Sequence, residues 1–471
     1  MTREAYESFW TASGLVEATC GSVVQGDLER SIVSISTDTR QIQPGDCFVA
    51  LPGEHADGHA FIPDALAKGA AALIVSAELS RLAVTAAAEV AVIKVPDTLF
   101  ALGDIARYFR LQHPIPVVGV TGSNGKTSTK EMVAAILGQH FQVLKNKGNF
   151  NNLIGVPLTI LSMEPRHQAA IVEMGINVPG EMARLVEIAG PTVGLITNVQ
   201  PAHLEGLNSL EEILKEKGKL WFSLGPEDLA VVNLDDERLA GLSKEIRART
   251  VTYSLTKAGA DVRLSSEVLT EGGASSFSLN LGGQSISACL PVLGLHHVGN
   301  ALAAAATGWG MGLSAELIAA GLKYYQPMKM RMQMHRLSKG RILIDDTYNA
   351  NPGSMLAAVR TVTRESRGQP VIAVLGDMRE LGTESAALHR EVGRHVASLG
   401  VSQLITLGQM SLELADGARR GGLAASAHRH AENHEEIVTW LRDHELEGAW
   451  ILVKGSRGMT MERVVEGILA Q

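Results

Sequence analysis

The chain has 471 residues, a formal net charge of −8 and 45% hydrophobic residues, enough apolar material for about two to four domains with buried cores. No basic stripe stands out among the 20% of charged residues, so nucleic acid is not an expected partner. The three cysteines, Cys20, Cys47 and Cys289, form no C-x-x-C pair. This argues against a zinc site or a disulfide framework and fits a reducing cytosol.

The N-terminal stretch MTREAYESFW is charged and lacks the apolar core of a signal peptide. The longest apolar stretches either fall short of an uncharged 18-residue span or are rich in glycine and alanine. We therefore expect a soluble, cytoplasmic protein without membrane insertion.

Residues 1–96 form the first expected domain, a small α/β unit. It contains the short strand DCFVALPG, the helical segment FIPDALAKGA and the strand AALIV, with glycine and proline turns between them. Residues 97–327 form the second expected domain. It opens with an amphipathic helix, DTLFALGDIARYFRLQ, for which Asp97 or Thr98 is the expected N-cap.

The second domain and the third, residues 328–471, share one pattern of short apolar runs alternating with helical stretches. The runs are PVVGV, AAIVEMG, VGLITNV and LAVVNLDD, then RILIDDTYN, PVIAVLGDM, SQLITLG and AWILVKGSRG. Near-continuous Val/Ile/Leu strands of this kind predict parallel sheets covered by helices on both faces, hence an α/β fold with a P-loop-type central sheet and a Rossmann-like third domain. Between Val251 and Leu290 the alternation and a Gly-Gly pair predict an antiparallel hairpin instead.

Polar residues stand at the carboxyl ends of the expected strands, where parallel sheets bind their ligands. The sequence therefore predicts a polar active site between two α/β domains, built from strand-end residues: Glu173, Asn198, Asp345, Asp346, Asp377, Lys454 and Arg457.

The segment VVGVTGSNGKTSTKEM, Val117–Met132, has the strand–turn–helix context of a phosphate-binding loop. Glycines at 119, 122 and 125 are expected to expose backbone N–H groups, Lys126 to reach the β- and γ-phosphates, and Thr127 or Ser128 to offer a hydroxyl to Mg²⁺. Val120 replaces the first glycine of the common G-x-x-x-x-G-K-[ST] pattern. The alternative is a tight turn that happens to carry a lysine.

Further candidates have two interpretations each. Glu173 is a magnesium ligand or a solvated turn carboxylate, and His203 is a ligand or a structural histidine. The segment with Asn149, Asn151 and Asn152 forms Asx turns or an amide-lined groove. DDTYNANPGSM is part of the site or a helix cap, and VKGSRGM is a second anion-binding turn or a helix start.

Taken in order, these segments resemble the ATP-dependent Mur ligases of peptidoglycan synthesis, which are related to folylpolyglutamate synthetase. GVTGSNGKTS matches the family's own nucleotide loop, T-G-[TS]-N-G-K-[TS], which lacks the distant glycine. The resemblance covers nearly the whole chain, through STDTRQIQPGDCFVALPGEHADGHAFIPDALAKGA, GNFNNLIGVPLTIL, VEMG, TNVQPAHLEGL, LGLHHVGNALAAAA, DDTYNANPGSM, LGDMRELG and KGSRGMTME.

The resemblance implies a role for each matching residue. The ATP phosphates are held by Gly122, Ser123, Asn124, Gly125, Lys126, Thr127 and Ser128, with Thr127, Glu173 and His203 as ligands of two Mg²⁺ ions. Asn300 resembles the adenine-contacting asparagine of an H-N-x-x-N pattern, in which His297 takes the place of the first asparagine. Arg331 and Asp346 resemble residues that close over the γ-phosphate and ribose. Lys217 sits where related ligases carry a carbamylated lysine that helps to hold the second magnesium ion. The UDP-linked substrate is assigned to Thr39, Arg40, Asp57, Gly58, His59, Asn151 and Asn152.

Within the family, DDTYNANPGSM and LGDMRELG are most similar to the member that joins D-alanyl-D-alanine to UDP-N-acetylmuramoyl-tripeptide. The D-N-P-R sequence of the diaminopimelate-adding member is absent. The expected partners are those two small molecules and ATP, and we expect a monomer. The alternatives are a Mur ligase that adds diaminopimelate or lysine, and a P-loop kinase or regulatory ATPase. Whether the tripeptide ends in diaminopimelate or lysine stays open.

Overall fold

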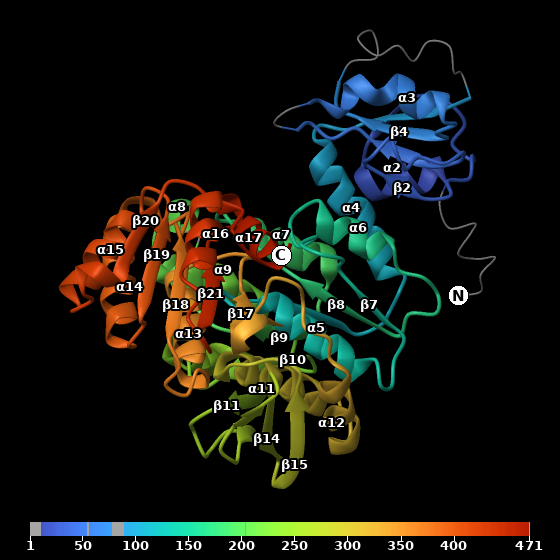
Figure 1. Ribbon diagram of the computed structural model, residues 1–471. Coiled ribbons are helices and arrows are strands. Elements are labelled where there is room, and N and C mark those ends of the chain that lie inside the picture. The colour runs from blue at the N-terminus through green and yellow to red at the C-terminus, as the bar shows by residue number, and fades with distance from the viewer. Residues whose placement is uncertain (1–10, 54–55, 78–88, 203, 471) are drawn as a thin grey trace.

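The computed structural model describes residues 11–53, 56–77, 89–202 and 204–470. In these ranges the strands form three separate sheets, one for each expected domain, and helices pack against them (Figure 1). The predicted three-domain α/β fold is confirmed. In the same ranges no helix is both long and apolar enough to span a bilayer.

The first sheet has the order β1-β5-β4-β3-β2. Its strands are β1 (Ser22–Gln25), β2 (Ile35–Ser36), β3 (Cys47–Val49), β4 (Ala72–Val75) and β5 (Ala91–Lys94), and only the β1–β5 pair is antiparallel. The accompanying helices are α2 (Ala12–Thr19), η1 (Gly58–Phe61) and α3 (Ile62–Ala67).

The middle sheet has the order β13-β14-β12-β11-β10-β9-β6-β8-β7, with β15 paired to β14. Its parallel strands are β6 (Val117–Thr121), β7 (Val143–Lys145), β8 (Ala169–Glu173), β9 (Val193–Ile196), β10 (Leu229–Asn233), β11 (Arg249–Ser254) and β12 (Val262–Leu264). The antiparallel part comprises β13 (Leu269–Glu271), β14 (Ala274–Leu281) and β15 (Gln284–Leu290). The helices are α4 (Thr98–Leu111), α5 (Lys126–Leu137), α6 (Gly155–Leu161), α7 (Glu181–Ala189), α8 (Leu204–Leu207), α9 (Leu210–Phe222), α10 (Glu237–Leu242), η3 (Ser243–Glu245), α11 (Leu295–Gly310) and α12 (Ala315–Tyr324).

The predicted hairpin between Val251 and Leu290 is correct only in its second half. β14 and β15 pair in antiparallel fashion around Gly282–Gly283, as expected. Val251, however, lies in β11, which runs parallel to β10. The intervening α10 makes β10 and β11 a strand–helix–strand unit, and such units place consecutive strands parallel.

The third sheet has the order β16-β17-β21-β18-β19-β20, with only β16 antiparallel to its neighbour. Its strands are β16 (Gln333–Arg336), β17 (Ile342–Asp345), β18 (Val371–Gly376), β19 (Gln403–Leu407), β20 (His428–Ala431) and β21 (Trp450–Lys454). The helices are η4 (Ser338–Gly340), α13 (Pro352–Glu365), η5 (Gly382–Glu384), α14 (Ser385–Ser398), α15 (Ser411–Arg420), η6 (Ala425–Ala427), α16 (His434–Asp443), η7 (Arg457–Met459) and α17 (Glu462–Leu469).

Two helix starts show which candidate caps are used. Asp97 caps α4 by accepting hydrogen bonds from the N–H groups of Leu99 (2.8 Å) and Phe100 (3.0 Å), whereas the Thr98 hydroxyl donates to the carbonyl of Ala50. In the segment DDTYNANPGSM the cap of α13 is Asn351, in a capping box with Ser354. The two aspartates of that segment are therefore left for other contacts.

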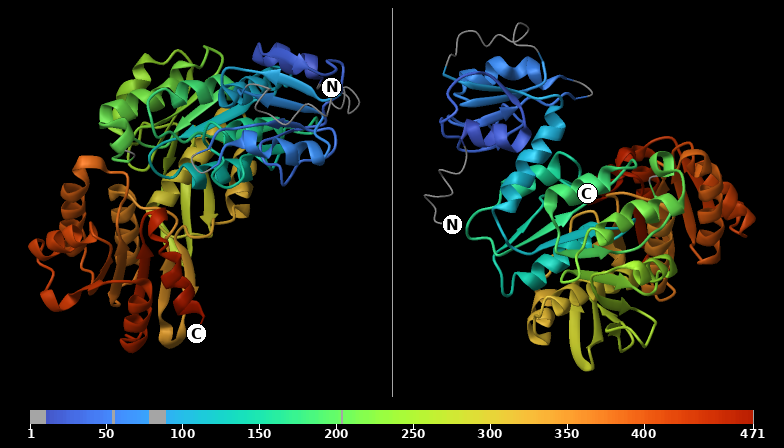
Figure 2. Two further views of the ribbon diagram at one scale, coloured as in Figure 1. Left: turned by 90° about the horizontal axis from the view of Figure 1, so that it is seen from above. Right: turned by 180° about the vertical axis from the view of Figure 1, so that it is seen from behind.

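The first domain stands apart from the other two and is joined to them through α4, as the front and rear views show (Figures 1 and 2). One apolar cluster runs from the first sheet across α4 to the middle sheet. The third domain lies beside the middle one. We propose domain boundaries near residues 96 and 327, since one sheet ends and α4 begins around the first position, and α12 ends and β16 begins around the second.

Candidate active site

A cleft of about 980 Å³ separates the middle and third domains, at the carboxyl ends of their parallel strands. Most of the residues predicted for ATP, magnesium and catalysis line it: Ser123, Asn124, Gly125, Lys126, Thr127, Ser128, Glu173, Asn300, Arg331 and Asp346. Asn151 and Asn152, which were predicted for the UDP-linked substrate, line it as well. The sequence therefore located this cleft from both of its sides.

The loop between β6 and α5 requires glycine at two positions. Gly122 and Gly125 have φ values of +145° and +80°, which other residues rarely adopt. A Cβ at Gly122 would lie 1.9 Å from Oγ1 of Thr197, and one at Gly125 would lie 2.4 Å from Oδ1 of Asn300. Gly119 does not share this role, because it lies inside β6, where a Cβ would meet the side chain of Leu220 at 2.9 Å.

The carboxyl end of β9 fixes the loop in place. The backbone N–H of Asn124 donates to Oδ1 of Asn198 at 2.9 Å, and the hydroxyl of Thr197 donates to the carbonyl of Asn124 at 2.6 Å. The Ser123 hydroxyl donates to the carbonyl of Gln200 at 2.8 Å. Asn198 was predicted from its strand-end position. Thr197 and Gln200 were not, because a threonine and a glutamine carry no distinctive sequence signal.

Lys126 begins α5 and folds back over its own loop. Its Nζ donates to the carbonyls of Gly122 (2.7 Å) and Ser123 (3.3 Å). Burial lowers the pKa of Lys126, and the nearby carboxylate of Glu173 opposes that shift. A bound triphosphate would add negative charge beside the ammonium group and favour its charged form.

Glu173, at the end of β8, faces the loop. Its Oε1 accepts hydrogen bonds from Thr127 Oγ1 at 3.3 Å and from Asn151 Nδ2 at 2.9 Å. Its buried Oε2 accepts no hydrogen bond from the described residues, and its ion-pair partner there is Lys130, at 3.7 Å. Mg²⁺ prefers oxygen ligands and is commonly bound by one or two carboxylates together with substrate phosphates. The hydroxyl of Thr127 and the incompletely satisfied carboxylate fit that donor set.

The asparagine-rich loop forms a predicted Asx turn and also lines the cleft. Oδ1 of Asn152 accepts from the N–H groups of Ile154 (3.2 Å) and Gly155 (2.9 Å), an Asx turn that starts α6. Asn151 instead turns its amide toward Glu173, and Asn149 also lines the cleft.

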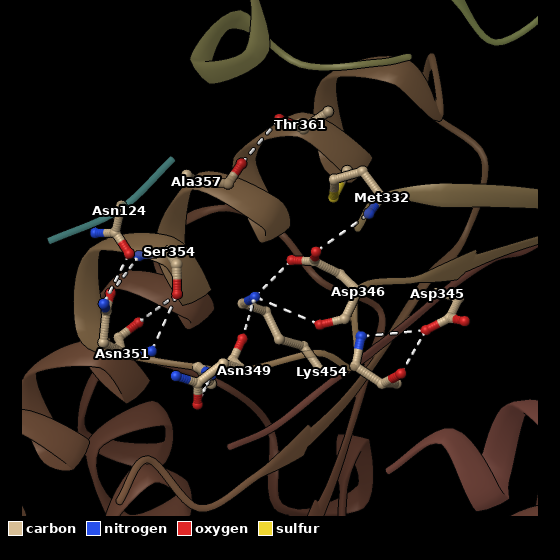
Figure 3. Close-up of polar contacts among 12 residues, drawn as sticks. Asn124, Met332, Asp345, Asp346, Asn349, Asn351, Ser354, Ala357, Thr361 and Lys454 are labelled. Atoms are coloured by element: carbon tan, nitrogen blue, oxygen red, sulfur yellow. Dashed lines mark hydrogen bonds and ion pairs between the residues drawn. The ribbon is translucent and has the colours of Figure 1, made fainter. Parts of the chain in front are cut away.

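On the opposite wall, Lys454 of β21 reaches the end of β17 (Figure 3). Its Nζ lies 2.5 Å from Oδ2 of Asp346 and donates to the carbonyl of Asn349 at 2.9 Å. Oδ1 of Asp346 accepts the backbone N–H of Met332 at 3.1 Å. Asp346 thus ties the segment before β16 to the centre of the third sheet.

Two of the predicted strand-end carboxylates do not line the cleft. Asp345 turns back to accept the N–H and hydroxyl of Thr347, at 3.1 and 2.6 Å. Asp377 accepts the N–H of Ser411 at 2.6 Å, at the start of α15. Adjacent residues of an extended chain point to opposite sides, so Asp345 and Asp346 cannot both face the ligand. The expectation for Asp345 was wrong for this reason, and the expectation for Asp377 was wrong because its carboxylate binds the N–H of Ser411 instead.

Two side-chain contacts cross the cleft. Nδ2 of Asn351 donates to Oδ1 of Asn124 at 2.7 Å (Figure 3), and Nη2 of Arg331 donates to Thr127 Oγ1 at 3.1 Å. The guanidinium of Arg331 also lies 4.1 Å from the ring centroid of Tyr348. The third domain therefore touches the phosphate-loop residues directly.

Two histidines lie beside the predicted adenine contact. The ring centroids of His296 and His297 lie 4.3 Å apart with the rings tilted by 43°, and both residues line the cleft with Asn300. Burial lowers the pKa of His296 to about 4 and holds the pKa of His297 well below its ordinary value. Both rings are therefore neutral at neutral pH.

Acidification is expected to destabilise the protein through these imidazoles. The unfolded chain protonates His296 near pH 6.5, whereas the folded protein does so only near its lowered pKa of about 4. The free energy of unfolding should therefore fall as the pH drops from about 6.5 to 4, by roughly 1–3 kcal/mol for this residue. Urea unfolding at pH 7 and 4.5 tests this, and His296→Gln should lose less stability than the wild type. An equal loss in the two proteins would contradict the assignment.

Five residues predicted to bind the UDP part lie in the first domain and do not line this cleft, namely Thr39, Arg40, Asp57, Gly58 and His59; the other two, Asn151 and Asn152, lie in the middle domain and line it. Arg40 is exposed and pairs with Asp38 at 2.8 Å, and the carbonyl of Thr39 accepts Nζ of Lys68 at 2.8 Å. Gly58 begins η1, directly after Asp57.

His59 forms hydrogen bonds with Asp57 and with the backbone of Ser76 in the first domain. Nδ1 of His59 lies 2.6 Å from Oδ1 of Asp57, and its Nε2 accepts the N–H of Ser76 at 3.0 Å. Because Nε2 accepts, Nδ1 carries the proton and donates to the carboxylate. This pair fastens the segment before η1 to the end of β4.

Two remaining candidates have different outcomes. Lys217 is buried in α9 outside the residues that line the cleft, and burial together with the charge of Lys126 holds its pKa well below the ordinary value. His203 lies outside the described residues.

Three family models match the chain: the Mur ligase family catalytic domain over residues 31–110, the Mur ligase middle domain over 120–308, and the Mur ligase glutamate ligase domain over 330–457. Among similar curated proteins is UDP-N-acetylmuramoyl-tripeptide–D-alanyl-D-alanine ligase from Escherichia coli, 37% identical over 97% of this chain and 98% of the relative. The protein of the same name from Bacillus subtilis is 34% identical, over 98% of each chain.

Solved structures agree. A crystal structure of MurF from Acinetobacter baumannii has a TM-score of 0.89 and 31% identity, over 98% of this chain and 99% of that one. MurF ligase from Thermotoga maritima in complex with ADP has a TM-score of 0.82 and 26% identity, over 92% and 96%. The chain therefore belongs to the Mur ligase family.

Proposed function

We propose that this enzyme joins D-alanyl-D-alanine to UDP-N-acetylmuramoyl-tripeptide at the expense of ATP, giving the UDP-muramoyl-pentapeptide precursor of peptidoglycan. The observation that carries the proposal is the single cleft in which Lys126 and Glu173 of one domain face Arg331 and Lys454 of the next. The relatives of that name match almost their entire length.

The first step transfers the γ-phosphoryl group of ATP to the terminal carboxylate of the tripeptide. A carboxylate oxygen forms a bond to phosphorus, the bond to the β–γ bridging oxygen breaks, and ADP leaves with its electron pair. Two anions must approach each other, so the site has to offset their repulsion. Lys126 and the backbone N–H groups after Gly122 lie on one side, and Arg331 lies on the other.

In the second step the amine of D-alanyl-D-alanine attacks the acyl carbon, phosphate leaves with the C–O electron pair, and the amine loses a proton. The acyl phosphate must be kept from water, which fits a site enclosed between two domains. The contacts of Asn351 with Asn124 and of Arg331 with Thr127 hold those domains together. Alignment of the reactants contributes roughly 7–11 kcal/mol to such reactions.

We propose that Mg²⁺ binds with ATP, and that two ions take part. Thr127 Oγ1, the Glu173 carboxylate and His203 would hold the magnesium ions, and His203 is assigned because it matches the family pattern. When bound, the ion would neutralise phosphate charge during transfer. Asn151 keeps Oε1 of Glu173 in place, and Arg331 already donates to the hydroxyl of Thr127.

We assign the UDP-linked end of the substrate to the first domain. The guanidinium of Arg40 is largely exposed, which suits a diphosphate. The bonds of Asp57 and His59 keep the segment around Gly58 in shape. The substrate would then run along α4 and the asparagine-rich loop, past Asn151 and Asn152, to the cleft.

We propose that the dipeptide binds in the third domain, around Arg379. This residue lines the main cleft and also a hollow of about 460 Å³ at the ends of β19 and β20. Its N–H donates to Oγ of Ser456 at 2.8 Å, and a Cβ at Gly458 would lie 2.3 Å from its Nη1. The glycine thus leaves room for the guanidinium, which can bind the dipeptide's carboxylate.

Arg379→Ala is expected to raise KM for D-alanyl-D-alanine about tenfold or more, because a charge-assisted hydrogen bond to the carboxylate is lost. KM for ATP should change less than about threefold, since the phosphate loop is untouched. Arg390→Ala, at a surface pair with Glu413 on α14 and α15, is the matched control. Equal changes in both KM values would place Arg379 elsewhere in the reaction.

We propose that Lys217 is carbamylated. Burial lowers the pKa of its amine, which favours the neutral form that reacts with CO₂. The resulting carbamate would place a negative charge near Lys126. Protein equilibrated with ¹³C-bicarbonate should show a carbamate carbon signal by NMR that Lys217→Arg lacks. An identical spectrum for the two proteins would exclude the modification.

We further propose that the protein acts as a monomer in the cytoplasm, with small molecules as its partners. Light scattering after gel filtration should give the mass of one chain. The mass of a dimer would contradict this.

The function is tested by phosphate release from ATP and UDP-N-acetylmuramoyl-tripeptide, with and without D-alanyl-D-alanine. Release should depend on the dipeptide and match pentapeptide formation. A second assay replaces both substrates, with UDP-N-acetylmuramoyl-dipeptide in place of the UDP-linked tripeptide and diaminopimelate or lysine in place of D-alanyl-D-alanine. Activity in this assay would identify the enzyme as another member of the family. Phosphate release or transfer without any amine would favour the kinase or ATPase alternative.

A further inference from the structure

A fully buried lysine lies one helical turn beyond Lys126 and has no part in the mechanism above. Lys130 of α5 has a side chain with no exposed surface. Its Nζ lies 3.2 Å from Oε1 of Glu131 and 3.7 Å from Oε2 of Glu173, and it donates to the carbonyl of Asn146 at 3.1 Å. Burying an ammonium group costs several kcal/mol unless it is paired, so this position needs a reason.

Asn146, the residue after β7, holds the backbone of Glu173 from both sides. The N–H of Glu173 donates to Oδ1 of Asn146 at 2.7 Å, and Nδ2 of Asn146 donates to the carbonyl of Glu173 at 3.0 Å. The same Nδ2 donates to the carbonyl of Phe150 at 2.7 Å, which fixes the asparagine-rich loop. Lys130 in turn holds the carbonyl of Asn146.

We propose that Lys130 and Asn146 are positioning residues that hold Glu173 against Thr127 for binding a divalent cation. Thr127 and Lys130 lie on the same helix, α5. Through Lys130 and Asn146, the backbone and the carboxylate of Glu173 are therefore held in position relative to the helix that carries Thr127, the other proposed ligand. Lys130 supplies a counter-charge to Oε2 without a hydrogen bond to it, which leaves that oxygen available. The inference rests on the proposed magnesium site and is independent of which amine is ligated.

Loss of groups that orient a metal ligand commonly weakens metal affinity by 10–100-fold. Lys130→Gln removes the charge and keeps a donor, Lys130→Met removes both, and Asn146→Ala removes the bonds to Glu173. The matched control is Lys145→Gln. Lys145 is a half-exposed lysine whose ion pair is with Glu131, which also pairs with Lys130, and not with Glu173.

The measurement is Mn²⁺ binding in the presence of ADP, followed by the electron paramagnetic resonance signal of free Mn²⁺, with no UDP substrate or dipeptide. Lys130→Met and Asn146→Ala should bind Mn²⁺ about tenfold or more weakly, and Lys145→Gln within about twofold of the wild type. Affinity for ADP in EDTA should stay within about threefold in every variant, which a general loss of structure would not allow.

Folded Lys130→Gln and Asn146→Ala proteins with wild-type Mn²⁺ affinity would overturn the inference. If Lys130→Met does not fold, these two variants are sufficient to test it. A parallel loss of Mn²⁺ and metal-free ADP affinity would overturn it as well, by showing a purely structural role. Wild-type protein that binds Mn²⁺ no better than Glu173→Gln would overturn the metal site itself. None of these three results depends on whether the enzyme proves to be the dipeptide-adding ligase.

Discussion

Lys126→Ala is expected to lower kcat/KM for ATP by at least about 10³-fold, close to 4 kcal/mol of transition-state stabilisation. The lysine begins α5 at the loop, and its Nζ is held by the carbonyls of Gly122 and Ser123, next to the place where the phosphates must bind. No other lysine occurs in the loop residues 122–128. Its charge therefore has no local substitute.

The fold should survive this change. The lost bonds go to two loop carbonyls, and the shape of the loop is maintained independently by Thr197, Asn198 and Gln200. The free energy of unfolding should therefore change by only about 1 kcal/mol. Steady-state kinetics and urea unfolding of Lys126→Ala test both statements, with Lys147→Ala, an exposed lysine of the neighbouring loop, as the control. Near-normal turnover would refute the role of Lys126.

The middle-domain residues chosen from local sequence signals mostly lie together along one cleft. The loop at 122–128 could be located because its glycines, its lysine and the apolar strand before it are contiguous, and each is required by short-range geometry. The strand-end rule found Glu173, Asn198, Asp346 and Lys454 because the carboxyl ends of parallel strands meet in one cleft. The rule did not predict which residues these four side chains contact.

What the sequence could not provide is the direction of individual side chains and the pairing of distant ones. The rule could not separate Asp346 from Asp345, which share a strand end and differ only in the face they point to. Lys130 looks like any surface lysine of an amphipathic helix until Glu173, the last residue of β8, and Asn146, the residue after β7, are placed around it.

Breaking the ion pair between Lys454 and Asp346 is expected to have the largest effect on stability. The side chains are 4% and 13% exposed and their charged atoms lie 2.5 Å apart. Lys454→Met would leave a largely buried carboxylate without its counter-charge and should lower the free energy of unfolding by about 3–5 kcal/mol. Urea unfolding at neutral pH measures the loss. A loss below about 1 kcal/mol would show that water reaches Asp346 and replaces the pair.

A double-mutant cycle separates this stability from catalysis. Lys454→Met combined with Asp346→Asn removes both charges, so it should recover much of the lost stability, with a coupling of roughly 1–3 kcal/mol. Activity should not recover, because both residues line the cleft opposite the phosphate loop. The pair joins the ends of β17 and β21, 108 residues apart in the chain. A double variant as active as the wild type would mean that this contact serves the fold of the third domain alone.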